Sequence, residues 1–266
     1  MSPGTAEWIR IRADSLLAEI DPVGAQLSVL RDAAGRDLLW HGDPAFWSGR
    51  APILFPIVGA LNGGHYSWRR NRYPLPRHGF ARGRRFEVIR HDAREALFRQ
   101  VSDAKTLQVY PFPFELDVLF RFEGNALAIE ASVRNTGHET MPASLGFHPA
   151  LRWPLPFGAA RESHFIEFEF AEGTHVRRLD AGGLLTEERH LALHDGLFKD
   201  DVVIFDHLRS RRLTYGADTG PRIQVTFANA SHLGIWSKPG AGFVCIEPWR
   251  GVADPEGFSG SLNDKP

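Results

Sequence analysis

The sequence predicts an all-β sandwich or barrel of many antiparallel strands. Apolar and polar residues alternate with period two in most segments, and no stretch keeps the i, i+3, i+4, i+7 apolar spacing of a helix for three turns. The 26 glycines and 18 prolines also interrupt the 266-residue chain too often for long helices. Short strands joined by turns are therefore expected throughout.

Individual strands follow from this alternation. In residues 222–227 it places Ile223, Val225 and Phe227 on one face of a strand, as expected for a half-buried sheet. The same pattern predicts strands in residues 7–12 and 164–170. Residues 116–122 and 126–133 flank Glu123-Gly124-Asn125 and predict a hairpin with these turn residues at its tip.

The composition favours a single domain over residues 1–266. No low-complexity linker or fixed-period repeat divides the chain, and its length allows one large core. Residues 251–266 are expected to run over the surface. With 31 basic and 32 acidic residues the net charge is −1, so we expect no nucleic-acid or membrane partner.

The cellular location and the oligomeric state are predicted from sequence features that the chain lacks. The chain has no apolar run of the roughly 18 residues that a membrane span needs, and no signal peptide at its beginning. Its one cysteine, Cys245, excludes an internal disulfide framework and predicts no Cys-based zinc site. The simplest expectation is a cytoplasmic monomer, since no long apolar edge strand stands out.

Three residues with acid–base side chains lie beside turn-forming residues. His78 precedes Gly79, and His148 precedes Pro149 at the end of a predicted strand. Glu247 ends an apolar strand and is followed by a proline and a tryptophan. A carboxyl at the rim of a buried sheet can have its pKa raised toward that of a general base.

Other chemistries have weaker support. The sequence contains no His-x-His, His-Glu-x-x-His or Gly-x-Ser-x-Gly pattern, so we expect neither a metal ion nor a serine nucleophile. Seven arginines and His78 fall within residues 69–85. This segment is interpreted as a solvated hairpin and loop, or alternatively as a source of one or two arginines that pair with a phosphate on a small ligand.

The three candidate residues lie in stretches that resemble the aldose 1-epimerase (galactose mutarotase-like) family. The resemblance is closest to its bacterial branch, which includes hexose-phosphate mutarotase relatives and a lactose-operon product. It is carried, in the family's order, by residues 39–44, 51–59, 75–82, 145–150 and 245–254.

This resemblance implies an antiparallel β-supersandwich and a cofactor-free reaction that interconverts the α and β anomers of an aldohexose or hexose phosphate. Glu247 would take the proton from the C1 hydroxyl, and His148 would protonate the ring oxygen. His78 would be the third catalytic residue, which hydrogen-bonds the sugar and assists at the ring oxygen. Each proton transfer of this kind accelerates a reaction by roughly 10²–10⁴-fold.

The resemblance also assigns sugar-binding residues. Asp201 matches a family aspartate that binds hydroxyl groups, with Asp200 as a second candidate. Trp249 and Phe147 would offer apolar surface to the C–H faces of the sugar, or would simply pack in the interior.

One position departs from the family pattern. Ala60 stands where many relatives carry a sugar-binding arginine. Arg82, or secondly Arg77, could replace that donor, and Arg82 matches a family arginine that contacts phosphate.

Three functions are compared on these grounds. A mutarotase is favoured because His78, His148 and Glu247 occur together. A non-catalytic sugar or sugar-phosphate binding module is the alternative that Ala60 suggests. A glycoside hydrolase is the third, but the sequence shows no second carboxylate in a comparable setting.

Overall fold

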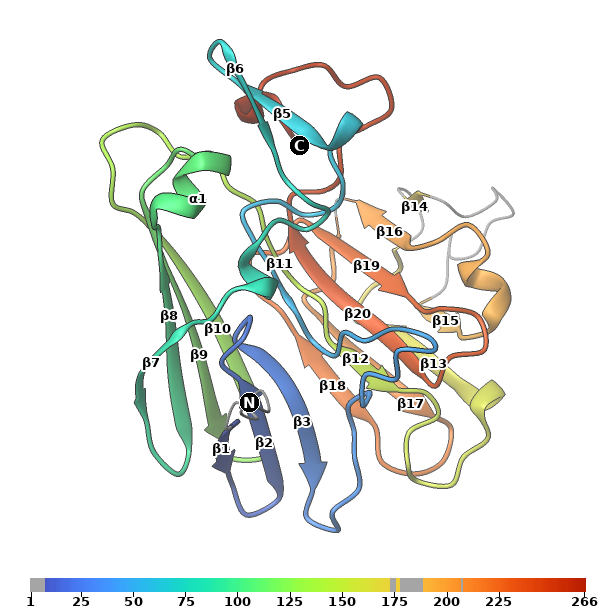
Figure 1. Ribbon diagram of the computed structural model, residues 1–266. Helices are drawn as coiled ribbons and strands as arrows, with labels where there is room; N and C mark the ends of the chain where they lie inside the picture. The colour runs from blue at the N-terminus through green and yellow to red at the C-terminus, as the bar shows by residue number, and fades with distance from the viewer. Residues whose placement is uncertain (1–7, 173–175, 178–188, 207) are drawn as a thin grey trace. The chain divides into compact units, whose positions relative to one another are not determined.

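The computed structural model describes residues 8–172, 176–177, 189–206 and 208–266 (Figure 1). Strands dominate this part of the chain, and its one α-helix, α1 (Ala104–Val109), spans only six residues. The predicted all-β fold with antiparallel sheets is therefore confirmed. No helix among these residues is long and apolar enough to cross a membrane.

The chain forms two compact units, and each is assembled from separate segments. The first unit comprises Met1–Gly35, Pro52–Gly146 and Gly251–Pro266, and the second comprises Arg36–Ala51 and Phe147–Arg250. The short strand β11 (Leu145–Phe147) contains the point at which the chain passes from one to the other. That the whole chain is a single domain stays a prediction.

Two antiparallel sheets and a hairpin make up most of the first unit. One sheet has the order β1 (Ile9–Arg12), β2 (Leu16–Asp21), β3 (Gln26–Asp32). The second has the order β10 (Ala126–Asn135), β9 (Phe114–Glu123), β8 (Glu95–Val101), β7 (Glu87–His91). The remaining elements are β4 (Ile53–Leu54), η1 (Asn62–Gly64), β5 (His65–Trp68), β6 (Asn71–Pro74), η2 (Ala81–Gly83) and η5 (Leu262–Asp264).

The predicted hairpin is formed by β9 and β10. Every second side chain of β9 is buried, from Phe114 to Phe122, as period-two alternation requires. Ala126 pairs with Glu123, so Gly124 and Asn125 form a two-residue turn. Gly124 has the positive φ of 59° that such tight hairpin turns need.

The segment Gly251–Pro266 does not merely cover the surface, so that expectation is wrong in part. Val252 and Leu262 are buried. The backbone N–H of Asn62 donates to the Asp254 carboxylate at 2.9 Å. Lys265 Nζ lies 3.4 Å from Asp254 Oδ1, and the two side chains are only 3% and 5% exposed. This segment completes the interior of the first unit.

The second unit holds two further antiparallel sheets. One contains the order β14 (Val176–Arg177), β16 (Val203–Asp206), β19 (His232–Trp236), β20 (Phe243–Arg250), with β12 (Ala150–Arg152) also paired to β20. The other has the order β15 (His190–Ala192), β13 (His164–Phe168), β17 (Arg212–Ala217), β18 (Ile223–Thr226). Two 3₁₀ turns complete the unit, η3 (Arg161–Ser163) and η4 (Asp195–Phe198).

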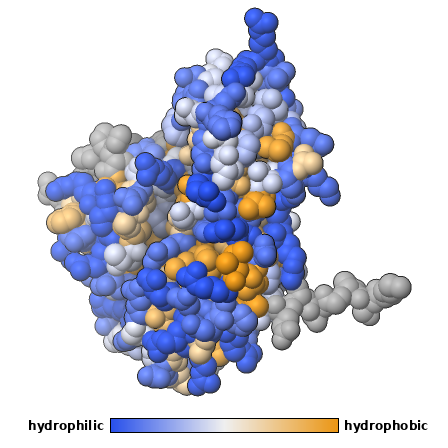
Figure 2. Space-filling model, turned by 90° about the vertical axis from the view of Figure 1, so that its left-hand side faces the viewer, coloured by the Kyte–Doolittle hydropathy of each residue, from blue (hydrophilic) through white to orange (hydrophobic). Residues whose placement is uncertain are grey.

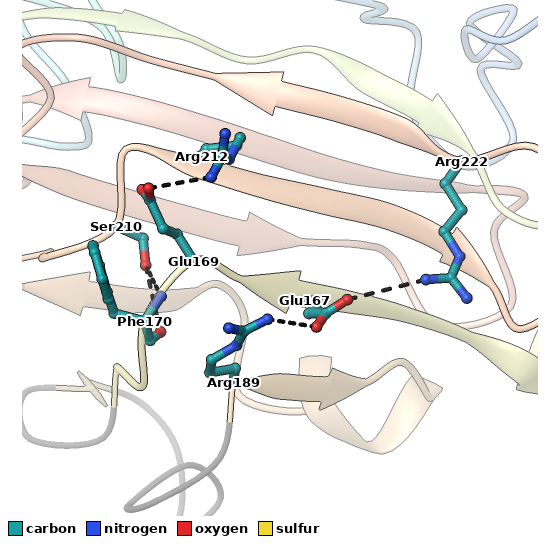
Figure 3. Close-up of polar contacts among 7 residues, drawn as sticks. All are labelled: Glu167, Glu169, Phe170, Arg189, Ser210, Arg212 and Arg222. Carbon is teal, nitrogen blue, oxygen red and sulfur yellow. Dashed lines mark hydrogen bonds and ion pairs between the residues drawn. The ribbon is translucent and has the colours of Figure 1, made fainter.

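Ion pairs cover the outer face of the β13 sheet (Figure 3). Glu167 lies 2.7 Å from Arg189 and 4.0 Å from Arg222, and Glu169 lies 3.4 Å from Arg212. Such partly exposed pairs contribute only about 0–1 kcal/mol each. Their position explains why acids interrupt the aromatic residues of this strand.

Six large apolar side chains are exposed in the part of the chain that the structure describes. Figure 2 shows a face that is predominantly hydrophilic, with apolar residues confined to smaller patches. Among the described residues the exposed large apolar side chains are Val23, Phe46, Ile89, Val101, Leu107 and Phe170.

Candidate active site

The last strand of the second unit carries the candidate carboxyl. Side chains alternate along β20, so Cys245, Glu247 and Trp249 share one face, and all three are buried. Gly234 on β19 pairs with Glu247. A Cβ added to Gly234 would lie 2.6 Å from the Trp249 indole, so only glycine lets the indole lie over β19 beside the carboxyl.

His148 reaches Glu247 through strand register. Ala150 pairs with Cys245, and extending this antiparallel pairing by two residues places His148 opposite Glu247. The carbonyl of Pro149 accepts a hydrogen bond from the Ile246 N–H at 3.2 Å and holds the intervening backbone. His148 Nε2 consequently lies 3.2 Å from Glu247 Oε2, with the two side chains 9% and 1% exposed.

Two tryptophans surround the imidazole, and sequence reasoning missed both. The Trp47 ring stacks on His148 at a centroid distance of 4.8 Å and an interplanar angle of 27°. Trp236 meets the imidazole edge-on at 5.8 Å and 87°. The Trp40 indole donates to the Trp47 carbonyl at 2.8 Å and fixes its backbone. No motif marks these residues, because only folding brings them to His148.

Burial governs the protonation of Glu247. It raises the pKa of this carboxyl well above 4.5, and the nearby charge of Asp201 acts in the same direction, whereas the Trp249 indole opposes it. Among the described residues, Glu247 Oε2 accepts no hydrogen bond. Burial therefore favours the protonated form of this carboxyl.

Asp201 lies within electrostatic reach of this pair. It adopts a positive φ of 80°, and its backbone N–H donates to the Phe198 carbonyl at 3.3 Å. Asp201 is half-buried, whereas Asp200 is exposed. Of these two candidates, only Asp201 appears among the charges that act on Glu247. Phe147, the residue before His148, is also half-buried.

His78 lies in the first unit, in a tightly constrained turn. Its backbone has a positive φ of 68°, and its Nδ1 accepts a hydrogen bond from the Gly59 N–H at 3.1 Å. Burial, aided by Arg82 and Arg77, lowers the pKa of His78 to about 3. The imidazole is therefore neutral at physiological pH, and because Nδ1 accepts from Gly59 its proton lies on Nε2.

The glycine after His78 explains why the turn is closed so tightly. Gly79 has a φ of 70°, and a Cβ there would lie 2.2 Å from the Phe55 carbonyl oxygen. Arg82 Nη2 donates to the Arg77 carbonyl at 2.9 Å. Arg77, Arg82 and Ala60 belong to the first unit, as His78 does. Glu247 and His148 belong to the second unit.

The buried neutral His78 should make stability depend on pH. Below its ordinary pKa of 6.5 the unfolded chain binds a proton that the folded chain excludes down to about 3, so stability falls as the pH falls through this window. The contribution is at most about 1.4 kcal/mol per pH unit. His78→Asn should flatten this dependence, since asparagine tolerates the left-handed backbone and still offers an acceptor to Gly59. Urea unfolding of both proteins between about pH 5 and 7.5 measures the difference; parallel profiles would contradict the assignment.

The site also contains a thiol that counting cysteines could not place. The potential ligand atoms of His148, Cys245 and Glu247 all lie within 4.8 Å of one another, and all three residues are buried. The expectation that the single cysteine forms no Cys-based zinc site stays a prediction.

The chain is thus an all-β protein in which a buried glutamate lies against a buried histidine. The chain matches the aldose 1-epimerase family model over residues 7–258. It therefore belongs to the aldose 1-epimerase family, as the resemblance in its sequence indicates.

Individual relatives extend over nearly the whole chain. The plasmid protein LacX of Lactococcus lactis is 30% identical over 276 residues, which cover 97% of this chain and 92% of LacX. A galactose mutarotase related enzyme from Lactobacillus acidophilus has a structure with a TM-score of 0.87 and 30% identity, covering 97% of this chain and 90% of its own. A galactose mutarotase-like protein from Lactobacillus casei gives a TM-score of 0.87 at 27% identity, with coverage of 97% and 92%.

Proposed function

We propose that this protein is an aldose 1-epimerase that opens and closes the ring of an aldohexose or hexose phosphate. The observation that carries the proposal is the buried contact of 3.2 Å between Glu247 Oε2 and His148 Nε2. Membership of the aldose 1-epimerase family supports a sugar as the substrate.

Anomer exchange needs a proton removed from one oxygen at C1 and another supplied to the ring oxygen on the same carbon. Adjacent Glu247 and His148 match that requirement, with Glu247 as base and His148 as acid. The reaction uses the form of the pair in which the imidazole carries the proton and the carboxyl is ionised, although burial favours the protonated carboxyl. Removal of the proton from the C1 hydroxyl and protonation of the ring oxygen break the bond between C1 and the ring oxygen and give the open aldehyde. Closure on the other face reverses both transfers.

The remaining candidates would hold the sugar. Asp201 would accept hydrogen bonds from hydroxyl groups, and the neutral His78 would hydrogen-bond the sugar from Nε2 and assist His148 at the ring oxygen. Trp249 and Phe147 would cover apolar C–H faces. Arg82 or Arg77 would take the part of the arginine that Ala60 replaces, with Arg82 as the first choice for a phosphate. A cytoplasmic location and a monomeric state stay predictions.

Saturation-transfer NMR of sugars at equilibrium tests the proposal directly. Glucose, galactose and glucose 6-phosphate would each be measured with and without protein. We expect faster exchange between anomers for at least one sugar, and a preference for the phosphate would support the assignment of Arg82. Binding without acceleration for any of these sugars would overturn the proposal in favour of a sugar-binding module.

A further inference from the structure

The buried cluster of His148, Cys245 and Glu247 has a donor set that the proposed reaction does not require. Cys245 and Glu247 lie two residues apart on β20 and share a face, and His148 lies opposite Glu247. We infer that this cluster binds a thiophilic divalent cation such as Zn²⁺ or Cd²⁺, with one imidazole nitrogen, one thiolate and one carboxylate as ligands.

The geometry is close to that of a three-ligand site. The ligand atoms lie within 4.8 Å of one another. Metal–ligand bonds of about 2.0–2.3 Å in a tetrahedron place ligand atoms roughly 3.3–3.8 Å apart. Side-chain rotations that move the ligand atoms by about 1 Å would therefore bring them to the separation that a bound metal ion requires. Three protein ligands also leave a fourth position for water or another small ligand.

The donor types favour these cations. Nitrogen and sulfur donors select zinc and its softer relatives over magnesium or calcium, which take oxygen ligands. Glu247 Oε2 accepts no hydrogen bond from the described residues, so its lone pairs are available.

The charges also balance on binding. Cys245 is fully buried in a cluster with Trp40, Ala150 and Phe243, and Glu247 is 1% exposed. As ligands, both groups release their protons to solvent, and the resulting thiolate and carboxylate would be two like charges here without water to solvate them. A dication cancels both and leaves a neutral site, which removes most of the cost of burying the anions.

Binding of a cation to this cluster would affect anomer exchange, and this consequence rests on the proposed function. The cation takes the same carboxylate oxygen and imidazole nitrogen that would move protons, so bound Zn²⁺ would inhibit anomer exchange. Binding itself is independent of whether the protein is an epimerase.

Titration of the metal-free full chain with Cd²⁺ tests the binding. We expect a saturable ultraviolet band from charge transfer between sulfur and metal, with one equivalent per chain. In Cys245→Ala the band should be absent, and the affinity measured by competition with a chromophoric chelator should fall at least tenfold. Cys245→Ser serves the same purpose if the alanine variant does not fold.

A second histidine–carboxylate pair provides a matched control. His232 Nε2 lies 3.2 Å from Asp206 Oδ1 in the same unit. His232→Gln should bind Cd²⁺ as tightly as the wild type. Absence of the band, or equal affinity of the wild type and both Cys245 variants, would overturn the inference whatever the sugar assays give. Binding without inhibition by Zn²⁺ would instead count against the catalytic assignment of the pair.

Discussion

Replacement of Glu247 with glutamine is expected to slow anomer exchange by about 10²–10⁴-fold, the usual contribution of a positioned proton acceptor. Glutamine keeps the shape of the side chain but cannot accept the proton of the C1 hydroxyl. The fold should survive, because Glu247 is 1% exposed and burial already disfavours its charged form. The saturation-transfer experiment measures the exchange rate, and near-ultraviolet circular dichroism checks the packing of the tryptophans.

A matched control separates loss of the base from a general effect of charge removal. Glu167→Gln removes a half-buried carboxyl that pairs with Arg189 on the outer face of β13, and its exchange rate should equal that of the wild type. His148→Gln should lose activity to an extent similar to Glu247→Gln, because both groups act in the same step. Near-normal exchange by a folded Glu247→Gln variant would exclude Glu247 as the base.

Replacement of Lys265 with methionine is expected to lower the free energy of unfolding by about 3–5 kcal/mol. Its ammonium pairs with Asp254 at 3.4 Å and donates to the Val252 carbonyl, and both charged side chains are almost inaccessible to solvent. Methionine fills similar space but leaves Asp254 as a buried carboxylate without its cation. Urea unfolding at neutral pH measures the loss.

Two comparisons show whether the buried charge causes the effect. The double variant Asp254→Asn, Lys265→Met should recover part of the lost stability, because no uncompensated anion remains. Arg10→Met breaks the pair between Arg10 and Glu19, in which the arginine side chain is 65% exposed, and should cost no more than about 1 kcal/mol. A loss for Lys265→Met as small as for Arg10→Met would show that the pair with Asp254 contributes little.

The sequence predicts the fold class because strand periodicity is a local signal. The β9–β10 hairpin follows from alternation and from Gly124, both visible in a few residues. The segment 164–170 shows the limit of that signal. The strand ends at Phe168, and Phe165 is buried on the outer face because Arg222 and His190 cover its ring.

The candidate site could be predicted only in part, since it depends on register between distant strands. The resemblance identified His148 and Glu247, but not the pairing of Ala150 with Cys245 that brings them together. Trp47 and Trp236 have no pattern that marks them as neighbours of His148. Burial of the chain beyond Gly251 could not be predicted either, because its apolar residues are too few to show periodicity.

The interleaved order of the two units bears on how the chain acquires its structure during synthesis. All segments of the second unit have emerged from the ribosome once Arg250 has passed, whereas the first unit still lacks Gly251–Pro266. Asn62 pairs with Asp254 and Ser67 pairs with Ser261, so both need partners that are synthesised almost two hundred residues later. The first unit therefore begins to form first but is completed last. Premature termination near residue 250 would leave the first unit incomplete, although the second unit would have all of its segments.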